Sequence, residues 1–379
     1  MTKNNKKKRI GIDARFYGPE NKGLGRYTQE VVDGIIAMDQ NNEYVIFLRE
    51  DNFDKFKTNN PRVKKVKANV RWYTFKEQLV FPFLIWQEKL DFIHFLHFNV
   101  PLFTPIKFIV TIHDLILTKH PTKRASTLSP LMYKIKNLIY QIIIYVAAKR
   151  ARYIIAVSEY TRKDIIKKFK VSTEKVIKIY EGVASSLQVR QKDDKEVILG
   201  YNIHRSYLLY VGNAYPHKNL EQLIKVFSKI KAEMPDLQLV LVGKKDYFYE
   251  RLKKSLENKF FDDIIFAGFV SDEDLISFYR EAEAYVFPSL FEGFGLPPLE
   301  AMTHGCVVAS SNKTCLPEVL GKAAKYFDPE NESEMAQIVI DLLKNKEEKN
   351  KLIQLGHTQV KKYNWEKCNK KIVRLYDLL

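Results

Sequence analysis

The sequence predicts two α/β domains, each built on a doubly wound parallel sheet. The chain has 379 residues, of which 46% are hydrophobic, and this is enough to fill two cores. Short apolar runs rich in β-branched and aromatic residues alternate with amphipathic segments, in two successive series. This alternation is typical of parallel strands in βα units. We therefore expect ligands to bind where loops leave the carboxyl ends of the strands.

The first series predicts a domain in residues 1–185 and the second a domain in residues 186–364. Residues 365–379 are expected to form a helix, with the first domain as its candidate packing partner. A polar, charged stretch, Ser185–Lys195, is the expected linker. The expected strands are Arg9–Asp13, Tyr44–Leu48, Asp91–Phe95, Phe108–Ile112 and Tyr153–Val157 in the first domain, then Tyr207–Val211, Leu237–Val242, Ile264–Phe266, Ala284–Phe287 and Val307–Ala309 in the second.

The net charge of +17 lies entirely in the first half of the chain. Residues 1–185 hold 34 Lys+Arg and 17 Asp+Glu, which leaves 28 of each kind for residues 186–379. A one-sided excess indicates that one domain faces an anionic partner, whether nucleic acid, membrane or phosphorylated substrate. The dense basic clusters are Lys6–Arg9, Lys64–Lys67, Lys149–Arg152 and Arg162–Lys170.

A cytosolic location is expected from the first residues and the cysteines. The Lys-rich N-terminus is not followed by the apolar segment of a secretory signal. Three cysteines without metal-ligand spacing fit a reducing compartment. The longest apolar segment, Leu131–Ala148, contains Lys134 and Lys136, so it predicts a buried or amphipathic helix rather than a membrane span.

Two glycine-containing loops are candidates for phosphate binding. Gly23 and Gly25 precede a helical pattern, where free amides favour an anion, although Thr28 stands where a dinucleotide fingerprint has its third glycine. In the second domain, Asn219 indicates a capping-box start of a helix, which places Lys218 just outside its N-terminus. A cation beside a helix N-terminus is unfavourable unless an anion lies between the cation and the free amides, which would make Lys218 a phosphate-binding residue. The alternative is that Lys218 is a solvated surface lysine.

The segment Phe291–Glu300 is the most specific in the chain. Glu292 lies in a glycine loop and Glu300 in the helix that follows it. Carboxylates accept hydrogen bonds from vicinal hydroxyls, and the amides of Gly293 and Gly295 are suited to phosphate or sugar oxygens. The pattern therefore indicates a polyhydroxylated, phosphorylated ligand, with an exposed Glu300 as the alternative.

Three further groups of polar residues allow two interpretations each. Asp272–Asp274 is similar to the acidic metal motif of some sugar transferases, but after Ser271 it fits a helix cap better. His113 follows an expected strand and is either a ligand-binding or a backbone-bonding histidine. The same choice holds for His94, His97 and Asn99, which could meet an acceptor.

Six segments, in family order and across nearly the whole chain, resemble the signature of retaining glycosyltransferase family 4. The resemblance implies the GT-B fold, in which two Rossmann-like domains face each other across a cleft. It is nearest to the mannosyltransferase-like branch that builds bacterial surface polysaccharides. The segments are Gly23–Tyr27, Thr111–Leu115, Val157–Thr161, Pro216–Leu220, Gly268–Asp272 and Phe291–Glu300.

The resemblance implies a role for each matching residue. Glu300 would bind the ribose hydroxyls of a GDP- or UDP-linked sugar, Glu292 the sugar near the reacting carbon, and Lys218 the departing diphosphate. Family members often pair this lysine with an arginine, which is missing here. His217 or Arg26 would then supply the second positive group at the diphosphate, or Lys218 would act alone. The other implied donor contacts are Gly23, Gly25, Phe269, Val270, Gly293, Phe294, Gly295 and Leu296, with His113 at the transferred sugar and His97 and Asn99 as weaker acceptor candidates.

These roles predict transfer with retention, without a metal or a cofactor beyond the nucleotide sugar. The acceptor would be a glycan or a lipid-diphosphate-linked glycan, and an anionic membrane surface is a further candidate partner at the inner face of the cell membrane. A sugar-nucleotide epimerase is the alternative enzyme, which the strings at Pro216–Lys218 and Phe291–Glu300 disfavour. A basic nucleic-acid-binding protein would need a binding module, which the sequence does not contain.

Overall fold

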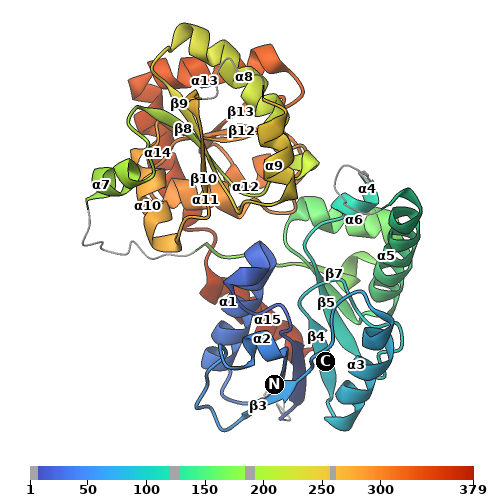
Figure 1. The fold of residues 1–379 in the computed structure, drawn as a ribbon. Coiled ribbons are helices and arrows are strands. Elements are labelled where there is room, and N and C mark those ends of the chain that lie inside the picture. Colours follow the sequence, from blue (N-terminus) through green and yellow to red (C-terminus); the bar gives the residue numbers. More distant parts are fainter. Residues whose placement is uncertain (1–6, 120–128, 184–192, 257–261) are drawn as a thin grey trace. The chain divides into compact units, whose positions relative to one another are not determined.

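The computed structural model describes residues 7–119, 129–183, 193–256 and 262–379. The chain divides into two compact units, residues 1–182 with 364–379 and residues 183–363 (Figure 1). Most of the expected linker, residues 185–192, and Lys6 of the first basic cluster lie outside the described residues. No helix in the described ranges is long and apolar enough to cross a membrane.

The first unit contains a seven-stranded parallel sheet with the order β3-β2-β1-β4-β5-β6-β7. Five of its strands match the predicted ones to within one residue at either end. The two edge strands were not predicted. The strands are β1 (Arg9–Asp13), β2 (Glu43–Leu48), β3 (Val63–Lys67), β4 (Phe92–Phe95), β5 (Phe108–Ile112), β6 (Tyr153–Ala156) and β7 (Val176–Lys178).

Helices cover both faces of this sheet. Phe81 of α3, Ile144 of α5 and Ile165 of α6 belong to one buried core, whereas Val31 of α1 and Ile372 of α15 belong to the core on the other face. The helical segments are η1 (Pro19–Asn21), α1 (Lys22–Met38), α2 (Glu50–Phe53), α3 (Phe75–Gln87), α4 (Ile116–Lys119), α5 (Pro130–Arg150), α6 (Glu159–Phe169), η3 (Thr173–Lys175) and α15 (Trp365–Asp377).

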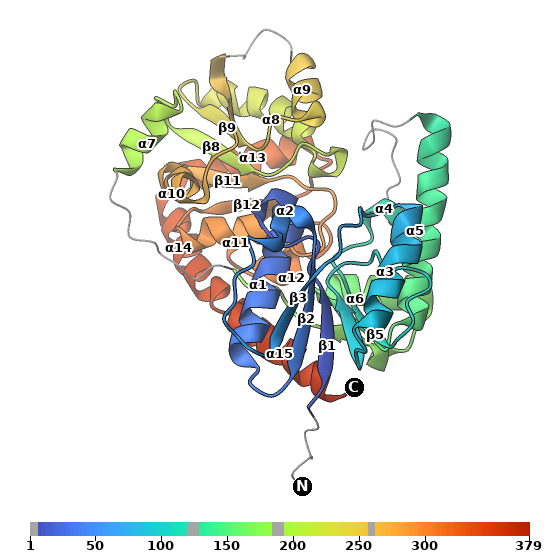
Figure 2. The ribbon, with the colours of Figure 1, turned by 60° about the horizontal axis from the view of Figure 1, so that its bottom comes forward.

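The last helix, α15, completes the first unit by packing against α1. Asn369 Nδ2 donates to the Glu30 carbonyl over 3.1 Å, and a side chain on Gly34 would lie 1.9 Å from the same amide nitrogen. The two helices lie side by side in both views (Figures 1 and 2). Gly34 therefore permits a close approach between segments that are more than 300 residues apart in sequence.

The second unit contains a six-stranded parallel sheet with the order β10-β9-β8-β11-β12-β13. Its strands are β8 (Tyr207–Val211), β9 (Gln238–Val242), β10 (Ile264–Gly268), β11 (Ala284–Phe287), β12 (Val308–Ser311) and β13 (Ala324–Phe327), of which β13, an edge strand, was not predicted. Its helical segments are α7 (Asp194–Gly200), η4 (Pro216–Lys218), α8 (Leu220–Glu233), α9 (Tyr247–Lys254), α10 (Asp272–Glu281), α11 (Leu296–Thr303), α12 (Leu316–Leu320), α13 (Glu332–Lys344) and α14 (Lys346–Val360).

Candidate functional site

Glycines bring the backbone of three neighbouring strands together at the carboxyl edge of the second sheet. The Gly212 amide donates to the Val242 carbonyl and the Gly243 amide to the Gly268 carbonyl, both over 2.9 Å. A side chain on Gly243 would lie 2.1 Å from the Gly212 oxygen, so this contact requires glycine. The strand ends after β8, β9 and β10 thus offer backbone rather than side chains to a ligand.

The turn after β8 carries Lys218 at the end of η4. The predicted capping box is wrong: Asn219 has φ +61°, makes no side-chain cap, and donates from Nδ2 to the Pro329 carbonyl over 2.9 Å. The Leu290 amide donates to the His217 carbonyl over 2.8 Å. The Asn219 side chain and the Leu290–His217 bond therefore connect the turn to two other loops, and the Asn219 side chain does not cap α8.

Lys218 forms an ion pair with Glu292, the loop carboxylate predicted to contact the sugar. The Nζ–Oε1 distance is 2.6 Å, and the two side chains are only 14% and 10% exposed. The ammonium group also lies 5.5 Å from the centre of the Phe287 ring. Lys218 is therefore a mostly buried cation rather than the solvated surface lysine considered as the alternative.

The loop that carries Glu292 is held by the segment after β12. Thr314 Oγ1 accepts from the Glu292 amide over 3.2 Å. The Cys315 thiol contacts the carbonyls of Glu292 and Phe294, both at 3.3 Å. These contacts fix the backbone of the loop around Gly293.

Gly295 ends this loop and begins α11. Its φ of +93° is one that L-residues rarely adopt, and a side chain there would lie 2.9 Å from Leu316 Cδ2. Leu296 and the two prolines after it form the first turn of α11, and Gly305, with φ +77°, follows its end. The predicted loop and helix N-terminus are confirmed, and the N-cap residue of that helix is Gly295, which has no side chain to cap it.

Glu300 lies on α11, partly buried beside two tyrosines. The Tyr279 hydroxyl donates to Glu300 Oε2 over 3.2 Å. The Tyr285 hydroxyl donates to the Val211 carbonyl at the end of β8 over 3.2 Å. Burial and, after it, the charge of Glu300 raise the pKa of Tyr285 well above its usual value. Glu300 is thus a positioned carboxylate near the end of β8, and the alternative of an exposed helix residue is wrong.

The predicted base contacts follow β10. Phe269 is 79% exposed, whereas Val270 is buried. The next residue, Ser271, caps α10, since its hydroxyl accepts from the Asp274 amide over 3.0 Å. The cap predicted in place of a metal motif is therefore confirmed.

In the first unit, His113 follows β5 and uses both ring nitrogens. Nδ1 lies 3.0 Å from Glu181 Oε1 and Nε2 lies 3.0 Å from the Leu96 carbonyl. Both partners are acceptors, so the arrangement suits the doubly protonated ring. Burial opposes the charge, but the hydrogen bond and the negative charge of Glu181 raise the pKa of His113 overall. His113 is consequently a fixed group near the end of β5.

Of the weaker acceptor candidates, His94 is structural. It is fully buried, with Nδ1 2.6 Å from the Tyr376 hydroxyl and Nε2 3.0 Å from Thr111 Oγ1. His97 is partly exposed, and its ring centre lies 6.5 Å from that of His113. Burial, followed by the charges of His113 and Arg15, lowers the pKa of His97 well below its usual value.

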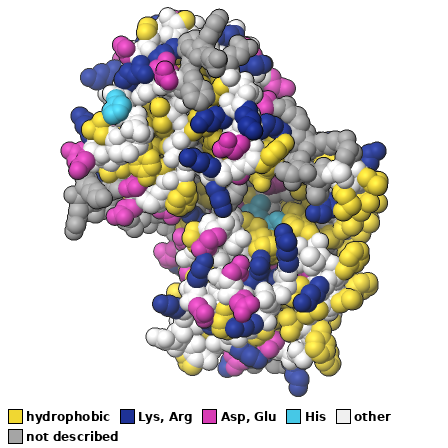
Figure 3. Space-filling model, in the orientation of Figure 1, with side chains coloured by type: hydrophobic (Ala, Val, Ile, Leu, Met, Phe, Trp, Pro, Cys, Tyr) yellow, Lys and Arg dark blue, Asp and Glu magenta, His cyan; other side chains and the backbone are white. Residues whose placement is uncertain are grey.

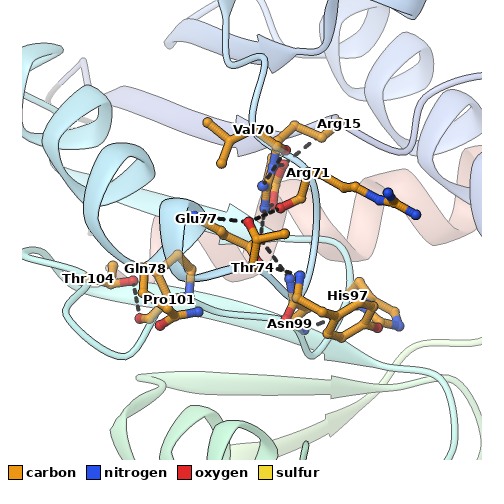
Figure 4. A network of polar contacts seen from close by, with 12 residues as sticks. Arg15, Val70, Arg71, Thr74, Glu77, Gln78, His97, Asn99, Pro101 and Thr104 are labelled. Carbon is orange, nitrogen blue, oxygen red and sulfur yellow. Dashed lines mark hydrogen bonds and ion pairs between the residues drawn. The ribbon is translucent and has the colours of Figure 1, made fainter. Parts of the chain in front are cut away.

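Asn99 belongs to a buried charge network that the sequence did not indicate (Figure 4). Arg15 pairs with both oxygens of Asp13 at 2.8 Å and with Glu77 Oε1 at 2.8 Å. Asn99 Nδ2 donates to the same Glu77 oxygen over 2.7 Å, and its Oδ1 is buried without a partner among the described residues. Asp13 and Arg15 lie at the carboxyl end of β1, and ligands of doubly wound sheets bind at such strand ends. This position was the one feature of the sequence that could have indicated the network.

The two glycines of the first unit that were predicted as ligand contacts differ in what surrounds them. Helix α1 begins at Lys22, so Gly23 and Gly25 lie in its first turns and not in the loop before it. A side chain on Gly25 would lie 1.9 Å from the Gly18 carbonyl, whereas one on Gly23 would meet nothing within 4 Å. The fold therefore requires glycine at position 25 and not at position 23.

Each half of the chain matches a family model of glycosyltransferases. Residues 21–187 match the family model described as Glycosyltransferase Family 4, and residues 191–359 match that of Glycosyl transferases group 1. O-antigen chain mannosyltransferase B of Escherichia coli is 30% identical over 233 residues, 60% of this chain and 61% of that protein. The chain spans less than two thirds of the length of the curated relatives it matches first.

Solved structures share the fold over nearly the whole chain. Sucrose-phosphate synthase from Thermosynechococcus elongatus has a TM-score of 0.75 and 18% identity, with 98% of each chain covered. HepE from Anabaena, in complex with UDP and glucose, has a TM-score of 0.73 and 16% identity, with 98% of this chain and 100% of that chain covered. The two sheets are those of a GT-B protein, and the chain consists of a Glycosyltransferase Family 4 domain in its first half and a Glycosyl transferases group 1 domain in its second half.

Proposed function

We propose that the chain is a retaining glycosyltransferase that transfers a hexose, with mannose as the first candidate, from a nucleotide-diphosphate sugar to a glycan or lipid-linked acceptor in cell-surface polysaccharide synthesis. The observation that carries the proposal is the Lys218–Glu292 ion pair at the carboxyl edge of the second sheet. It places a mostly buried cation beside a glycine loop that leads into α11, and Gly293, Phe294, Gly295 and Leu296 of this stretch each carry a backbone amide. This is an arrangement that favours phosphate and sugar oxygens.

In this proposal each group has one task at the donor. Glu300 accepts hydrogen bonds from the ribose hydroxyls, and Phe269 and Val270 lie at the base. Amides from Gly293 to Leu296 hold sugar and phosphate oxygens, and Glu292 contacts a sugar hydroxyl. Gly23 and Gly25 of the first unit approach the donor, and His113 approaches the transferred sugar. The donor needs no further cofactor and no metal ion.

The chemical step breaks the bond between the anomeric carbon and the diphosphate oxygen and forms a bond to the acceptor hydroxyl oxygen. Positive charge develops on the sugar and negative charge on the leaving oxygen, which receives the acceptor proton. Lys218 and the amides of Gly293 to Leu296 stabilise that oxygen, at about 3 to 4 kcal/mol for one strong preorganised contact. Attack on the face that the diphosphate leaves retains the anomeric configuration.

The donor sugar and the acceptor are proposed from the relatives. O-antigen mannosyltransferases of Escherichia coli and Salmonella are each about 30% identical to this chain over more than half of it. HepE binds UDP and UDP-glucose, which supports a nucleotide-sugar donor. We accordingly propose a GDP- or UDP-linked hexose, mannose first, and a cytoplasmic protein that meets a lipid-linked acceptor at the inner membrane face.

The test begins with a panel of nucleotide sugars and the shift of the unfolding temperature, because a bound donor stabilises the folded state by mass action. The sugar that protects is then incubated with acceptor glycans, and the product is examined by NMR. We expect transfer with retained configuration that survives a chelator. An inverted product, an epimerised donor, or activity that only Mn²⁺ or Mg²⁺ restores would contradict the proposal.

A further inference from the structure

Exposed apolar side chains of the first unit gather on α3 and α5, which cover the same face of the seven-stranded sheet. Figure 3 shows hydrophobic side chains along the right-hand edge, where Figure 1 places these two helices. A helix that packs on a sheet ordinarily buries one apolar stripe and exposes a polar one. Both of these helices carry a second apolar stripe, and that stripe is exposed.

On α5, the buried stripe includes Tyr140, Ile144 and Ala148, which pack in the core. The exposed stripe has apolar residues at spacings of four, three, four and three, which place them on one side of the helix. Its members are Leu131, Ile135, Leu138, Ile142 and Tyr145, all more than 40% exposed.

On α3, Phe81 and Ile85 are buried in the same core. The exposed stripe consists of Phe75, Leu79, Phe83 and Trp86, and the rings of Phe83 and Trp86 stack with centres 5.9 Å apart. Phe75 is 86% and Trp86 is 64% exposed. We call the two exposed stripes together the α3/α5 face.

The exposed charges on these two helices have one sign. Helix α5 contains no Asp or Glu, and its Lys134 and Lys136 are exposed. Helix α3 has one carboxylate, Glu77, which is fully buried and paired with Arg15, whereas its Lys76 is exposed. Over the described side chains of these two helices, the surface is therefore apolar and positively charged, without an exposed carboxylate.

We propose that the α3/α5 face docks on an anionic lipid bilayer, with its apolar side chains at the acyl-chain boundary and its lysines at the lipid phosphates. Basic amphipathic helices that lie in the membrane plane combine these two features. Trp86 and Tyr145 have amphipathic rings of the kind enriched at the membrane–water interface. The purpose of this docking rests on the proposed function, since a lipid-linked acceptor lies in the same membrane.

The charge of the α3/α5 face favours an anionic bilayer over a second copy of the chain as its partner. A two-fold dimer through the α3/α5 face would bring Lys134 and Lys136 of one copy toward the same face of the other, without an exposed carboxylate on either helix to compensate them. Like charges across an interface oppose association. Anionic phosphates supply the compensation that a second copy lacks.

The experiment is flotation of the full chain with vesicles of phosphatidylcholine, with and without phosphatidylglycerol. The stripe variant is Leu138→Ser with Ile142→Ser, and the charge variant is Lys134→Gln with Lys136→Gln. The matched control is Leu199→Ser with Tyr247→Ser, which changes two exposed apolar residues of the second unit. We expect the parent and the control to float with the anionic vesicles, and both α5 variants to bind about tenfold or more weakly.

Trp86 gives a second readout, because lipids brominated on the acyl chains quench a tryptophan that reaches them. We expect quenching in the parent that Trp86→Phe largely removes. Three outcomes overturn the proposal: a parent that does not float, α5 variants that float as the parent does, or a dimer that the stripe variant dissociates while no vesicle binds. Donor protection against heat is measured on the same samples, so loss of docking with intact protection leaves the proposed function standing.

Discussion

At the scale of single residues, Lys218 has Glu292 as its ion partner, and a donor diphosphate would compete for the same ammonium group. Lys218→Ala removes the charge that meets the leaving oxygen, so the turnover number should fall by roughly 10²–10³-fold with a smaller change in donor affinity. Glu300→Ala removes the proposed ribose contacts, so the donor Kd should rise about 10- to 100-fold. Steady-state kinetics and donor titration measure the two effects separately.

The control for both variants is Lys225→Ala, an exposed position on α8. Its kinetic parameters should equal those of the parent. Lys218→Arg should recover part of the turnover, since the positive charge remains. Parent-like activity in both the Lys218 and Glu300 variants would remove the donor-site assignment.

The His113–Glu181 pair gives a pH-dependent prediction. Glu181 raises the pKa of His113 in the folded state above the unfolded value of about 6.5. The folded state then holds the proton more tightly, so this stabilisation is fully present below about pH 6.5 and is lost as pH rises through the folded pKa. In Glu181→Gln the pKa of His113 should fall.

Two measurements check this prediction. NMR of the imidazole protons follows the pKa of His113 in the parent and in Glu181→Gln. Urea unfolding at about one pH unit below and two units above 6.5 should show the larger stability difference between the proteins at the lower pH. An equal difference at both pH values would mean that the pair acts through neutral hydrogen bonding alone.

The sequence predicted the carboxylates and the lysine of the candidate site but not the residues that hold them. Glu292, Glu300 and Lys218 lie in local patterns whose spacing is visible in the chain. Thr314 and Tyr279 contact them from other loops and helices, and such contacts depend on the order of strands in the sheet. The Lys218–Glu292 pair joins loops 74 residues apart, which no local pattern indicates.

At the scale of elements, the two glycines in the first turns of α1 allow a role in packing to be tested separately from a role in ligand binding. Gly25→Ala should destabilise the protein by about 1–3 kcal/mol, because a Cβ there overlaps the Gly18 carbonyl. Gly23→Ala should leave the unfolding free energy unchanged or raise it by up to about 1 kcal/mol, since alanine favours the helix. If the donor approaches this turn, Gly23→Ala should weaken donor binding although the variant is as stable as the parent.

Urea unfolding measures the stability of both variants, and donor titration measures their donor affinity. Unaltered donor binding in Gly23→Ala would remove Gly23 from the donor site.

The strands that the sequence did not predict are all at sheet edges. The missed strands β3, β7 and β13 are three to five residues long, and β3 has three lysines among its five residues, Val63-Lys-Lys-Val-Lys67. Central strands are buried on both faces and form apolar runs, which are easily recognised. Edge strands are short and often carry lysine, so their sequences resemble loops.

At the scale of the whole molecule, the second unit is one continuous segment, whereas the first depends on α15. Ile372, Leu375 and Tyr376 of α15 are buried in the core of the first unit. Removal of residues 364–379 should therefore unfold or loosen the first unit, while residues 183–363 keep their own core and bind the donor. Thermal unfolding with and without the donor checks this: the truncated chain should keep one transition that the donor raises. A single donor-insensitive transition would show that the units do not fold separately.

The return of α15 to the first unit also sets an order for folding during synthesis. The ribosome releases residues 1–182 long before residues 364–379 exist, so the face of the first sheet that α15 covers stays open while the whole second unit is made. Domains made of one segment generally fold as they emerge. The second unit is consequently the first to reach its final packing, and the apolar face beside α1 is the surface that a chaperone would shield until translation has passed Tyr376.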